Sequence, residues 1–291
     1  MSNRRRFALL VAAALALAGC RQAEVVHPAL WQVDGPQGER AWLFGTIHAL
    51  PAPVNWRSAK VEAALAGADR LVVEVADGND PAKAAAVFRR LDASTGLPPL
   101  RQRLPEARRA AYDRLLAEHS ARPDQFDRRE TWAAALELNQ LLLAQSRSES
   151  ANGIDRALLD DPPARRIEQF EGLEPQLALF DQLPEPDQRA LLESVIAGAA
   201  DAPRETAALQ VAWKGGNMAA IAALDHKGML ADPELRQILL VERNQAWTAR
   251  LRTLLTGGAK PFVAVGALHM AGPDGLPAQL ERQGYRVTRI Q

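Results

Sequence analysis

Two histidines stand at the same distance behind a glycine that follows an apolar run. Residues 42–48 read Trp-Leu-Phe-Gly-Thr-Ile-His and contain Gly45 and His48. Residues 263–269 read Val-Ala-Val-Gly-Ala-Leu-His and contain Gly266 and His269. Such apolar runs predict buried strands, and ligands of open α/β sheets bind outside the carboxyl ends of the strands. A glycine there lets the backbone turn sharply and leaves room for a ligand. We therefore expect His48 and His269 at equivalent positions on one edge of a sheet.

A carboxylate joins these two imidazoles. Glu74 lies near the end of a third apolar run, residues 71–75, where an unpaired charge would be costly to bury. Two histidines and one carboxylate are a sufficient ligand set for a catalytic divalent metal ion that keeps positions open for water. A single strand-end histidine is more often a capping or hydrogen-bonded imidazole. Two in matched settings, together with Glu74, favour a functional site over that structural interpretation.

Arg243 interrupts the apolar face of a predicted helix. The residues of that face are Leu240, Arg243, Trp247, Leu251 and Leu254, at helical spacing. A buried guanidinium requires a carboxylate or an anionic ligand as its partner. The structural alternatives are an ion pair with Glu74, Asp155 or Glu171, or a side chain that reaches solvent.

Composition excludes several classes of protein. The 291 residues are 47% hydrophobic and 24% charged, which is typical of a globular chain rather than a disordered one. One cysteine rules out a disulfide scaffold, and a net charge of zero disfavours a nucleic-acid partner. The sequence has no nucleotide-binding glycine loop, no His-Glu-x-x-His and no Gly-x-Ser-x-Gly, so nucleotide enzymes, standard zincins and elbow-type serine hydrolases are disfavoured.

The elements that must position these residues predict an α/β (α+β) fold. Its central sheet is built from N- and C-terminal strands, with a large helical middle region. Strands are expected at residues 30–33, 41–44, 70–75, 166–170, 261–265 and 285–290, the last at a sheet edge. Helices are expected at residues 59–66, 81–91, 105–118, 131–146, 175–183, 187–197, 206–213, 233–255 and 274–283. The start of the last helix, at Pro273 and Asp274, would direct its positive dipole end toward the predicted site.

The N-terminal segment has the features of a lipoprotein signal. Three arginines precede an apolar run at residues 7–18, which is too short to span a bilayer. Residues 17–20, where this run ends, read Leu-Ala-Gly-Cys. This motif resembles the bacterial lipobox and predicts a signal peptide at 1–19, a lipidated Cys20, and a linker at 20–28. The alternative is an ordinary signal peptide with an incidental cysteine. From Cys20 onward the chain has 32 basic and 35 acidic residues, so we expect lipid to be the anchor. Arg21 weakly favours the outer membrane over the inner membrane.

Six motifs in order resemble the TraB/GumN family, which is related to the animal Tiki proteins. They lie at residues 43–51, 73–75, 153–158, 171–177, 242–247 and 262–272, and the likeness runs from about Trp31 to the C-terminus. The resemblance implies one TraB/GumN-like domain at 29–291. It adds Gly45, Asp155, Glu171, Asn244 and Gly266 to the candidate site. Tiki proteins are described as metal-dependent proteases, which implies a divalent cation such as manganese, cobalt or zinc here.

The functional hypothesis is a lipid-anchored hydrolase that faces the periplasm, needs a divalent metal ion and acts on a peptide or protein. His48, His269 and Glu74 would be metal ligands, with Glu74 alternatively a general base. Arg243 would stabilise an oxyanion or fix Glu74. The rival hypotheses are a non-catalytic binding protein for a peptide, haem or metal, and an accessory factor in polysaccharide or envelope biology.

Overall fold

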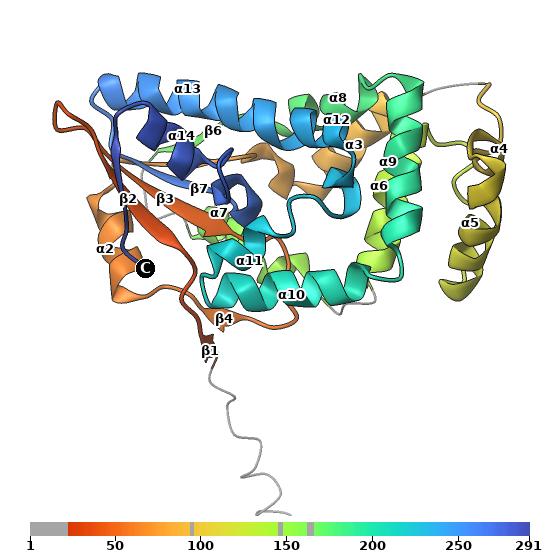
Figure 1. The fold of residues 1–291 in the computed structure, drawn as a ribbon, viewed down its shortest axis with the longest axis horizontal. Helices are drawn as coiled ribbons and strands as arrows, with labels where there is room; N and C mark the ends of the chain where they lie inside the picture. Colours follow the sequence, from red (N-terminus) through yellow and green to blue (C-terminus); the bar gives the residue numbers. More distant parts are fainter. Residues whose placement is uncertain (1–22, 94–95, 145–147, 162–165) are drawn as a thin grey trace, which may run out of the picture.

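A six-stranded mixed sheet is the framework of the molecule (Figure 1). The computed structural model describes residues 23–93, 96–144, 148–161 and 166–291. The strands are β2 (Leu30–Asp34), β3 (Arg40–Thr46), β5 (Arg70–Val73), β6 (Ile167–Gln169), β7 (Pro261–Gly266) and β8 (Arg286–Arg289). Their order in the sheet is β6-β5-β7-β3-β2-β8, and the first four are parallel. The predicted sheet of N- and C-terminal strands is confirmed, with β8 at an edge.

The two central strands are apolar on both faces because each face packs against a separate core. Phe44 and Phe262 face one core, and their rings lie 5.7 Å apart. The alternating residues Leu43 and Val263 face the other core. Side chains of successive strand residues point to opposite faces. The continuous apolar runs in the sequence therefore reflect a sheet that is covered on both sides.

Helices cover both faces and continue into a helical lobe beyond the sheet (Figure 1). They are α2 (Ala59–Gly67), α3 (Pro81–Leu91), α4 (Leu100–Arg103), α5 (Glu106–Glu118), α6 (Thr131–Leu143), α7 (Ile154–Asp160), α8 (Leu173–Asp181), α9 (Glu185–Gly198), α10 (Ala202–Lys214), α11 (Met218–Ala222), α12 (Pro233–Arg236), α13 (Arg243–Thr256) and α14 (Leu276–Arg282). Helices α4, α5, α6, α9 and α12 share a third apolar cluster around the fully buried Trp132. The predicted helical middle region is confirmed.

The helix expected at residues 233–255 contains a π-helical segment. Asp232 caps α12 by accepting hydrogen bonds from the backbone of Glu234 and Leu235, and Pro233 occupies the first turn. After α12 the chain forms the π segment η5 (Gln237–Glu242), and α13 begins at Arg243. The predicted extent was right, but the segment is not one regular α-helix. Single π turns inside helices are often found at functional sites.

Some short elements were not predicted. Strands β1 (Glu24–Val25) and β4 (Val54–Asn55) form a separate parallel pair. The helices α4, α7 and α11 were also missed, as were four 3-10 turns: η1 (Asp77–Asn79), η3 (Ser150–Asn152), η4 (Gly228–Ala231) and η6 (Ala267–Met270). Each is too short for a periodic apolar pattern to identify it.

The last helix begins later than expected. Helix α14 starts at Leu276 rather than at Pro273 and Asp274. The Asp274 carboxylate pairs with Arg236 at 2.9 Å, and its carbonyl accepts a hydrogen bond from Asn244, also at 2.9 Å. These contacts hold residue 274 outside the helix. The predicted dipole end is therefore absent at this position, and residues 273–276 are not among those that line the site cavity described below.

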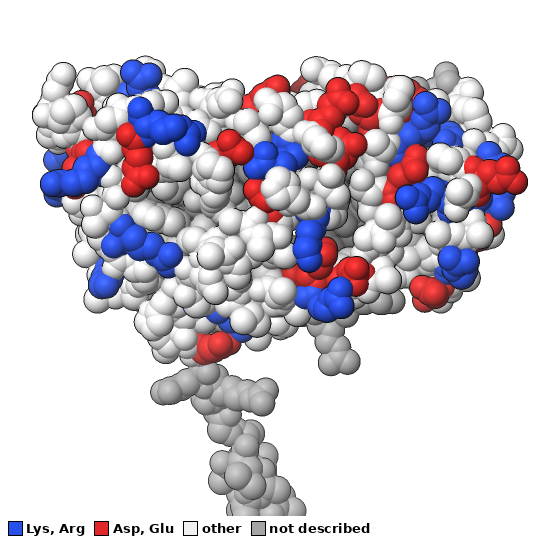
Figure 2. Space-filling model, viewed as in Figure 1, with Lys and Arg blue, Asp and Glu red and all other residues white. Residues whose placement is uncertain are grey.

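The surface is mixed in charge. On the face in Figure 2, acidic and basic side chains are interspersed, without a large patch of one sign. No helix within the described ranges is long and apolar enough to cross a membrane. The predicted signal peptide and Cys20 lie outside the described residues.

Candidate active site

The four parallel strands each place a candidate residue just beyond their carboxyl ends. Glu171 follows β6, Glu74 follows β5, His269 follows β7 and His48 follows β3. Because these strands are neighbours in the order β6-β5-β7-β3, the four side chains lie in the same order along one edge of the sheet. This topology brings together four residues that lie far apart in the sequence.

A cavity of about 460 Å³ opens at this edge. Its floor includes His48, Glu74, Gly266, His269 and Arg243. Its walls come mainly from apolar side chains of the helical lobe, which are Leu136, Leu177, Leu179, Phe180, Leu209, Trp213, Met229, Leu230, Leu239 and Leu240. A mostly apolar cavity with a few convergent polar groups is the usual form of a ligand site.

Glu74 is buried and ionised at the centre of the floor. One of its oxygens, Oε1, accepts a hydrogen bond of 2.6 Å from the backbone N–H of Gly266. The other, Oε2, accepts one of 3.1 Å from Arg243 Nη2. Burial alone would raise the pKa of Glu74, but His269, His48, Arg243 and the Gly266 N–H together lower it to about 2. The carboxylate predicted to need a partner has two.

Arg243 uses all of its donors within the protein. Nε and Nη2 donate to the two oxygens of Glu171 at 2.9 Å each, and Nη2 also donates to Glu74. Nη1 donates to the carbonyl of Leu239 at 3.1 Å and lies 3.3 Å from His269 Nε2. A guanidinium has five N–H donors, so each has a partner here. The structural alternative of an ion pair is confirmed, with both Glu74 and Glu171 as partners, whereas Asp155 is not a partner.

His269 is held as a neutral imidazole. The Asn244 amide nitrogen donates to the carbonyl of Asp274, so the amide oxygen is turned toward His269 Nδ1, 2.7 Å away. Nδ1 must therefore carry the proton, and the lone pair on Nε2 faces Arg243. Burial, with a contribution from Arg243, lowers the pKa of His269 to about 4. The ring also packs on Trp247, with centroids 4.4 Å apart.

His48 has a different environment. Its Nδ1 donates to Asp155 Oδ2 at 2.9 Å, and Thr46 donates its hydroxyl to the other oxygen of Asp155 at 2.5 Å. His48 borders the cavity, so 72% of its side chain is exposed. The charge of Asp155 raises the pKa of His48 to about 10, against the effect of desolvation.

The two Gly-x-x-His motifs are therefore not equivalent in the structure. Gly45 pairs with Val265 rather than with Gly266, so the motifs are offset by one residue in the sheet. Gly45 also lies within β3 rather than at its end, and a Cβ there would be 3.2 Å from Ala267 Cβ. The first motif exposes its histidine, and the second buries its own in the turn η6. The prediction of equivalent positions was wrong in this respect.

Gly266 leaves space between the candidate ligands. A Cβ at this position would lie 3.1 Å from Glu74 Oε1, 3.7 Å from His48 Nε2 and 3.8 Å from His269 Cδ2. The three candidate side chains thus surround the same small volume. Within the ranges that the structure describes, however, no group of three or more His, Cys, Asp or Glu side chains is placed to hold a metal ion without rearrangement.

Three residues of the site were not singled out from the sequence. Thr46 fixes Asp155, and Trp247 donates its indole N–H to Glu171 at 2.9 Å. Gly153 allows α7 to approach the first motif, because a Cβ there would be 2.2 Å from the His48 carbonyl oxygen. The Gly-Ile-Asp run at 153–155 was the available signal for this contact.

Comparison with known proteins agrees with the motifs. Residues 29–289 match the model of the TraB/PrgY/gumN family. The chain belongs to this family. It is similar to two relatives, each named "Uncharacterized protein YbaP", from Shigella flexneri and Escherichia coli (strain K12). Each is 27% identical to this TraB/PrgY/gumN member over 255 residues, or 84% of this chain and 89% of the relative. No solved structure matches.

Replacing Asp155 tests the charge state of His48. In Asp155→Asn we expect the pKa of His48 to fall by about 1–3 units, because an opposite charge in contact shifts a pKa by that amount. Because the pKa of His48 is higher in the folded state, its protonation stabilises the fold. This contribution is fully present below the unfolded-state pKa of about 6.5 and is lost as the pH rises through about 10. The stability difference between wild type and variant should therefore be larger at pH 6 than at pH 10. NMR titration of the His48 ring and urea unfolding measure the two effects.

Asp160→Asn is the matched control, because Asp160 lies on the same helix and pairs with Arg156 at the surface. An unchanged His48 pKa in Asp155→Asn would contradict the assignment.

Replacing Arg243 tests the buried charge network. Arg243→Ala leaves Glu74 and Glu171 without their shared cation, and loss of one partner of a buried pair costs about 3–5 kcal/mol of unfolding free energy. Arg252→Ala, an exposed change on the same helix, should stay within about 0.5 kcal/mol of wild type. Urea unfolding at pH 7 measures both. Equal stabilities of the two variants would show that Arg243 is not structurally important.

Proposed function

We propose that the protein is a hydrolase of the bacterial cell envelope that requires a divalent metal ion and cleaves a peptide bond. The observation that carries this proposal is the convergence of His48, Glu74 and His269 around Gly266 on the floor of an apolar cavity. Family membership supports the fold and the motif residues, and resemblance to Tiki proteins supports the reaction class. Fold alone does not define a reaction, so the site must be tested directly.

The donor chemistry of these residues fits a divalent metal ion such as manganese, cobalt or zinc. Each histidine has Nδ1 bound to an oxygen, of Asp155 or of Asn244, which leaves Nε2 as the ligand atom. On binding of an ion, His48 would lose its Nε2 proton and His269 Nε2 would lose its contact with Arg243 Nη1. Glu74 provides an ionised carboxylate between them. His48 is the exposed member of the three and has room to move, whereas Glu74 and His269 are buried. We therefore assign His48, Glu74 and His269 as the residues that would hold the ion.

A bound divalent ion would polarise a carbonyl group and lower the pKa of water from about 15.7 to about 7. The residues of the chain supply the rest of the site. A Glu74 carboxylate with a pKa of about 2 is a weak base, which favours a ligand role over general base catalysis. Arg243 donates to Glu74 and Glu171 through Nε and Nη2, so we assign it as a positioning residue that fixes Glu74. An ion on His269 Nε2 would leave only the Nη1 donor that faces that atom unpaired.

Metal content and peptide cleavage test this proposal together. Protein beginning at Arg21, in its wild-type form and as His48→Ala and His269→Ala, is analysed by mass spectrometry for bound metal and for cleavage of a peptide mixture. We expect both variants to lose at least tenfold in activity and to bind less metal. His226→Ala is the control, because His226 is 71% exposed and contacts Asp225 away from the cavity. Folded variants with wild-type metal content and equal activity would refute the hydrolase proposal.

A non-catalytic binding protein is the second candidate. The apolar walls of the cavity and the fully paired Arg243 are suited to retention of a peptide, haem or metal without turnover. If His48→Ala and His269→Ala abolish binding and no cleavage is found in the wild type, this second function is supported instead.

We also propose that the protein is anchored by lipid on Cys20 and faces the periplasm. The lipobox-like residues 17–20 support this placement, and Arg21 weakly favours the outer membrane. Metabolic labelling with palmitate should mark the wild type and fail to mark Cys20→Ser, while Ser2→Ala, at the other end of the signal, should be labelled normally. Labelling of Cys20→Ser would exclude this anchor.

A further inference from the structure

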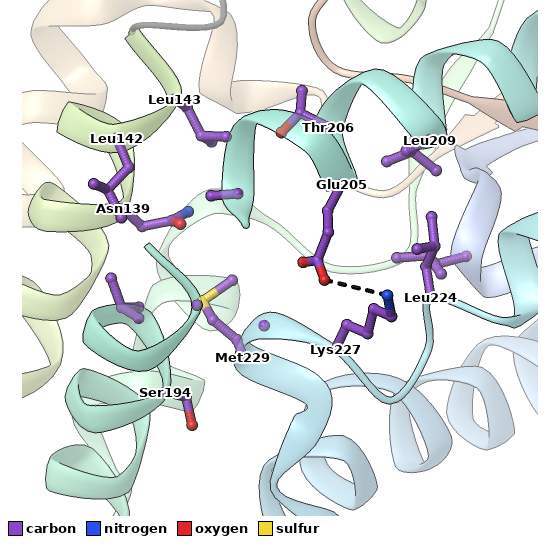
Figure 3. A pocket seen from close by; sticks show the side chains of 15 residues that line it. Asn139, Leu142, Leu143, Ser194, Glu205, Thr206, Leu209, Leu224, Lys227 and Met229 are labelled. Atoms are coloured by element: carbon purple, nitrogen blue, oxygen red, sulfur yellow. Dashed lines mark ion pairs between the residues drawn. The ribbon is translucent and has the colours of Figure 1, made fainter. Parts of the chain in front are cut away.

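A second pocket of about 250 Å³ lies beside the site cavity, and we call it the side pocket (Figure 3). It is formed by α6, α9, the first half of α10, and the turn η4 with the residues before it. None of the residues assigned to the metal site lines it. Its contents would therefore contribute to ligand selection rather than to the chemical step.

The side pocket and the site cavity share part of their lining. Asn139, Leu209, Met229 and Leu268 border both spaces. Leu268 directly precedes His269, so the boundary between the two spaces lies next to a proposed metal ligand. A ligand in the site cavity that extends past these shared lining residues would enter the side pocket.

The side pocket is suited to an uncharged apolar group. Leu142, Val195 and Leu224 contribute apolar surface to its walls. The charged groups among its lining residues, Glu205 and Lys227, form an ion pair of 3.4 Å and neutralise each other (Figure 3). A charged ligand group would lose water there without finding an unpaired opposite charge, which is unfavourable.

Asn139 provides a polar group at the junction. In Figure 3 its amide points from α6 toward the interior of the side pocket. It makes no side-chain hydrogen bond to any residue within the described ranges. An amide side chain can donate to a carbonyl and accept from an N–H, which is the pattern that a peptide group presents.

We propose that the side pocket is a subsite that binds an uncharged apolar side chain of a peptide, whose backbone passes Asn139 on its way to the site cavity. This inference rests on the proposed peptide-cleaving function, because it assigns a substrate preference to that same site. It identifies the lobe helices α6, α9 and α10 as the elements that select the substrate. A fatty acyl chain is the competing occupant, which the experiment below distinguishes.

Gly198 is the residue through which the side pocket can be filled. It is the last residue of α9, and a Cβ there would meet only Gly228 Cα, at 4.0 Å. Gly198→Leu should therefore occupy the side pocket without contacting the metal site, and Gly198→Ala is the matched control. If Gly198→Leu does not fold, Ser194→Asp places a charge in the same pocket, with Ser194→Ala as its control.

The probe is an octapeptide library with every position varied. Peptides that co-elute with the protein in gel filtration, and peptide bonds that are cleaved, are both identified by mass spectrometry. For wild type and Gly198→Ala we expect Leu, Ile, Met or Phe to be preferred at one fixed position at least tenfold over Asp, Glu or Lys, equivalent to about 1.4 kcal/mol. In Gly198→Leu this preference should fall below about threefold, because the space for the side chain is occupied.

Each outcome separates the subsite from the proposed reaction. Retained peptides with this preference but no cleavage support the subsite and refute the hydrolase. Cleavage with a preference unchanged in folded Gly198→Leu overturns the subsite and leaves the hydrolase standing. The absence of both retention and cleavage overturns both the subsite and the hydrolase proposal. If no peptide is retained, but palmitate is retained tightly by wild type and not by Gly198→Leu, the peptide subsite is overturned in favour of an acyl chain.

Discussion

The buried guanidinium of Arg243 is the charge around which the carboxyl edge of the sheet is organised. Removing such a group from water costs several kcal/mol unless its donors are fully paired. Here the partners come from the ends of β5 and β6, from the preceding helical turn and from the turn after β7. Because a guanidinium is planar and its donor directions are fixed, these segments must meet in one arrangement. The position of Glu74 thus follows from the pairing of Arg243.

The fold separates the chemistry of the site from the shape of the space above it. Parallel strands from the two ends of the chain provide the imidazoles and carboxylates, and their neighbouring ends need no long loops to bring these groups together. Helices from the middle of the chain provide the walls of the cavity and of the side pocket. Substitutions in the lobe can therefore reshape these walls while the network around Arg243 is unchanged.

Much of the fold and part of the site could be predicted from the sequence. The central strands were identifiable because both of their faces are buried, and Arg243 was identifiable because a charge on an apolar helix face requires a partner. The partner of His48 was not predicted, because Asp155 lies on the seven-residue helix α7, which has no side-chain cap and follows a close approach at Gly153. The contrast between His48 and His269 also could not be predicted. It depends on Trp247 and Asn244, which reach His269 only through tertiary packing.

The π segment Gln237–Glu242 has a consequence for how the gene can vary. It lies between Arg236, which binds Asp225 and Asp274, and Arg243, which binds Glu74 and Glu171. A π turn holds one residue more than the α-helical turn it replaces, so the residues on its two sides keep the register of a regular α-helix that is one residue shorter. The loss of one codon in this segment would therefore remove the π turn and leave both arginines directed at their partners, whereas the same loss in a regular α-helix turns everything beyond it by about 100°. Gln237 and Glu242 are exposed and can be exchanged for other residues, so this stretch can vary in sequence at these positions and can lose one residue.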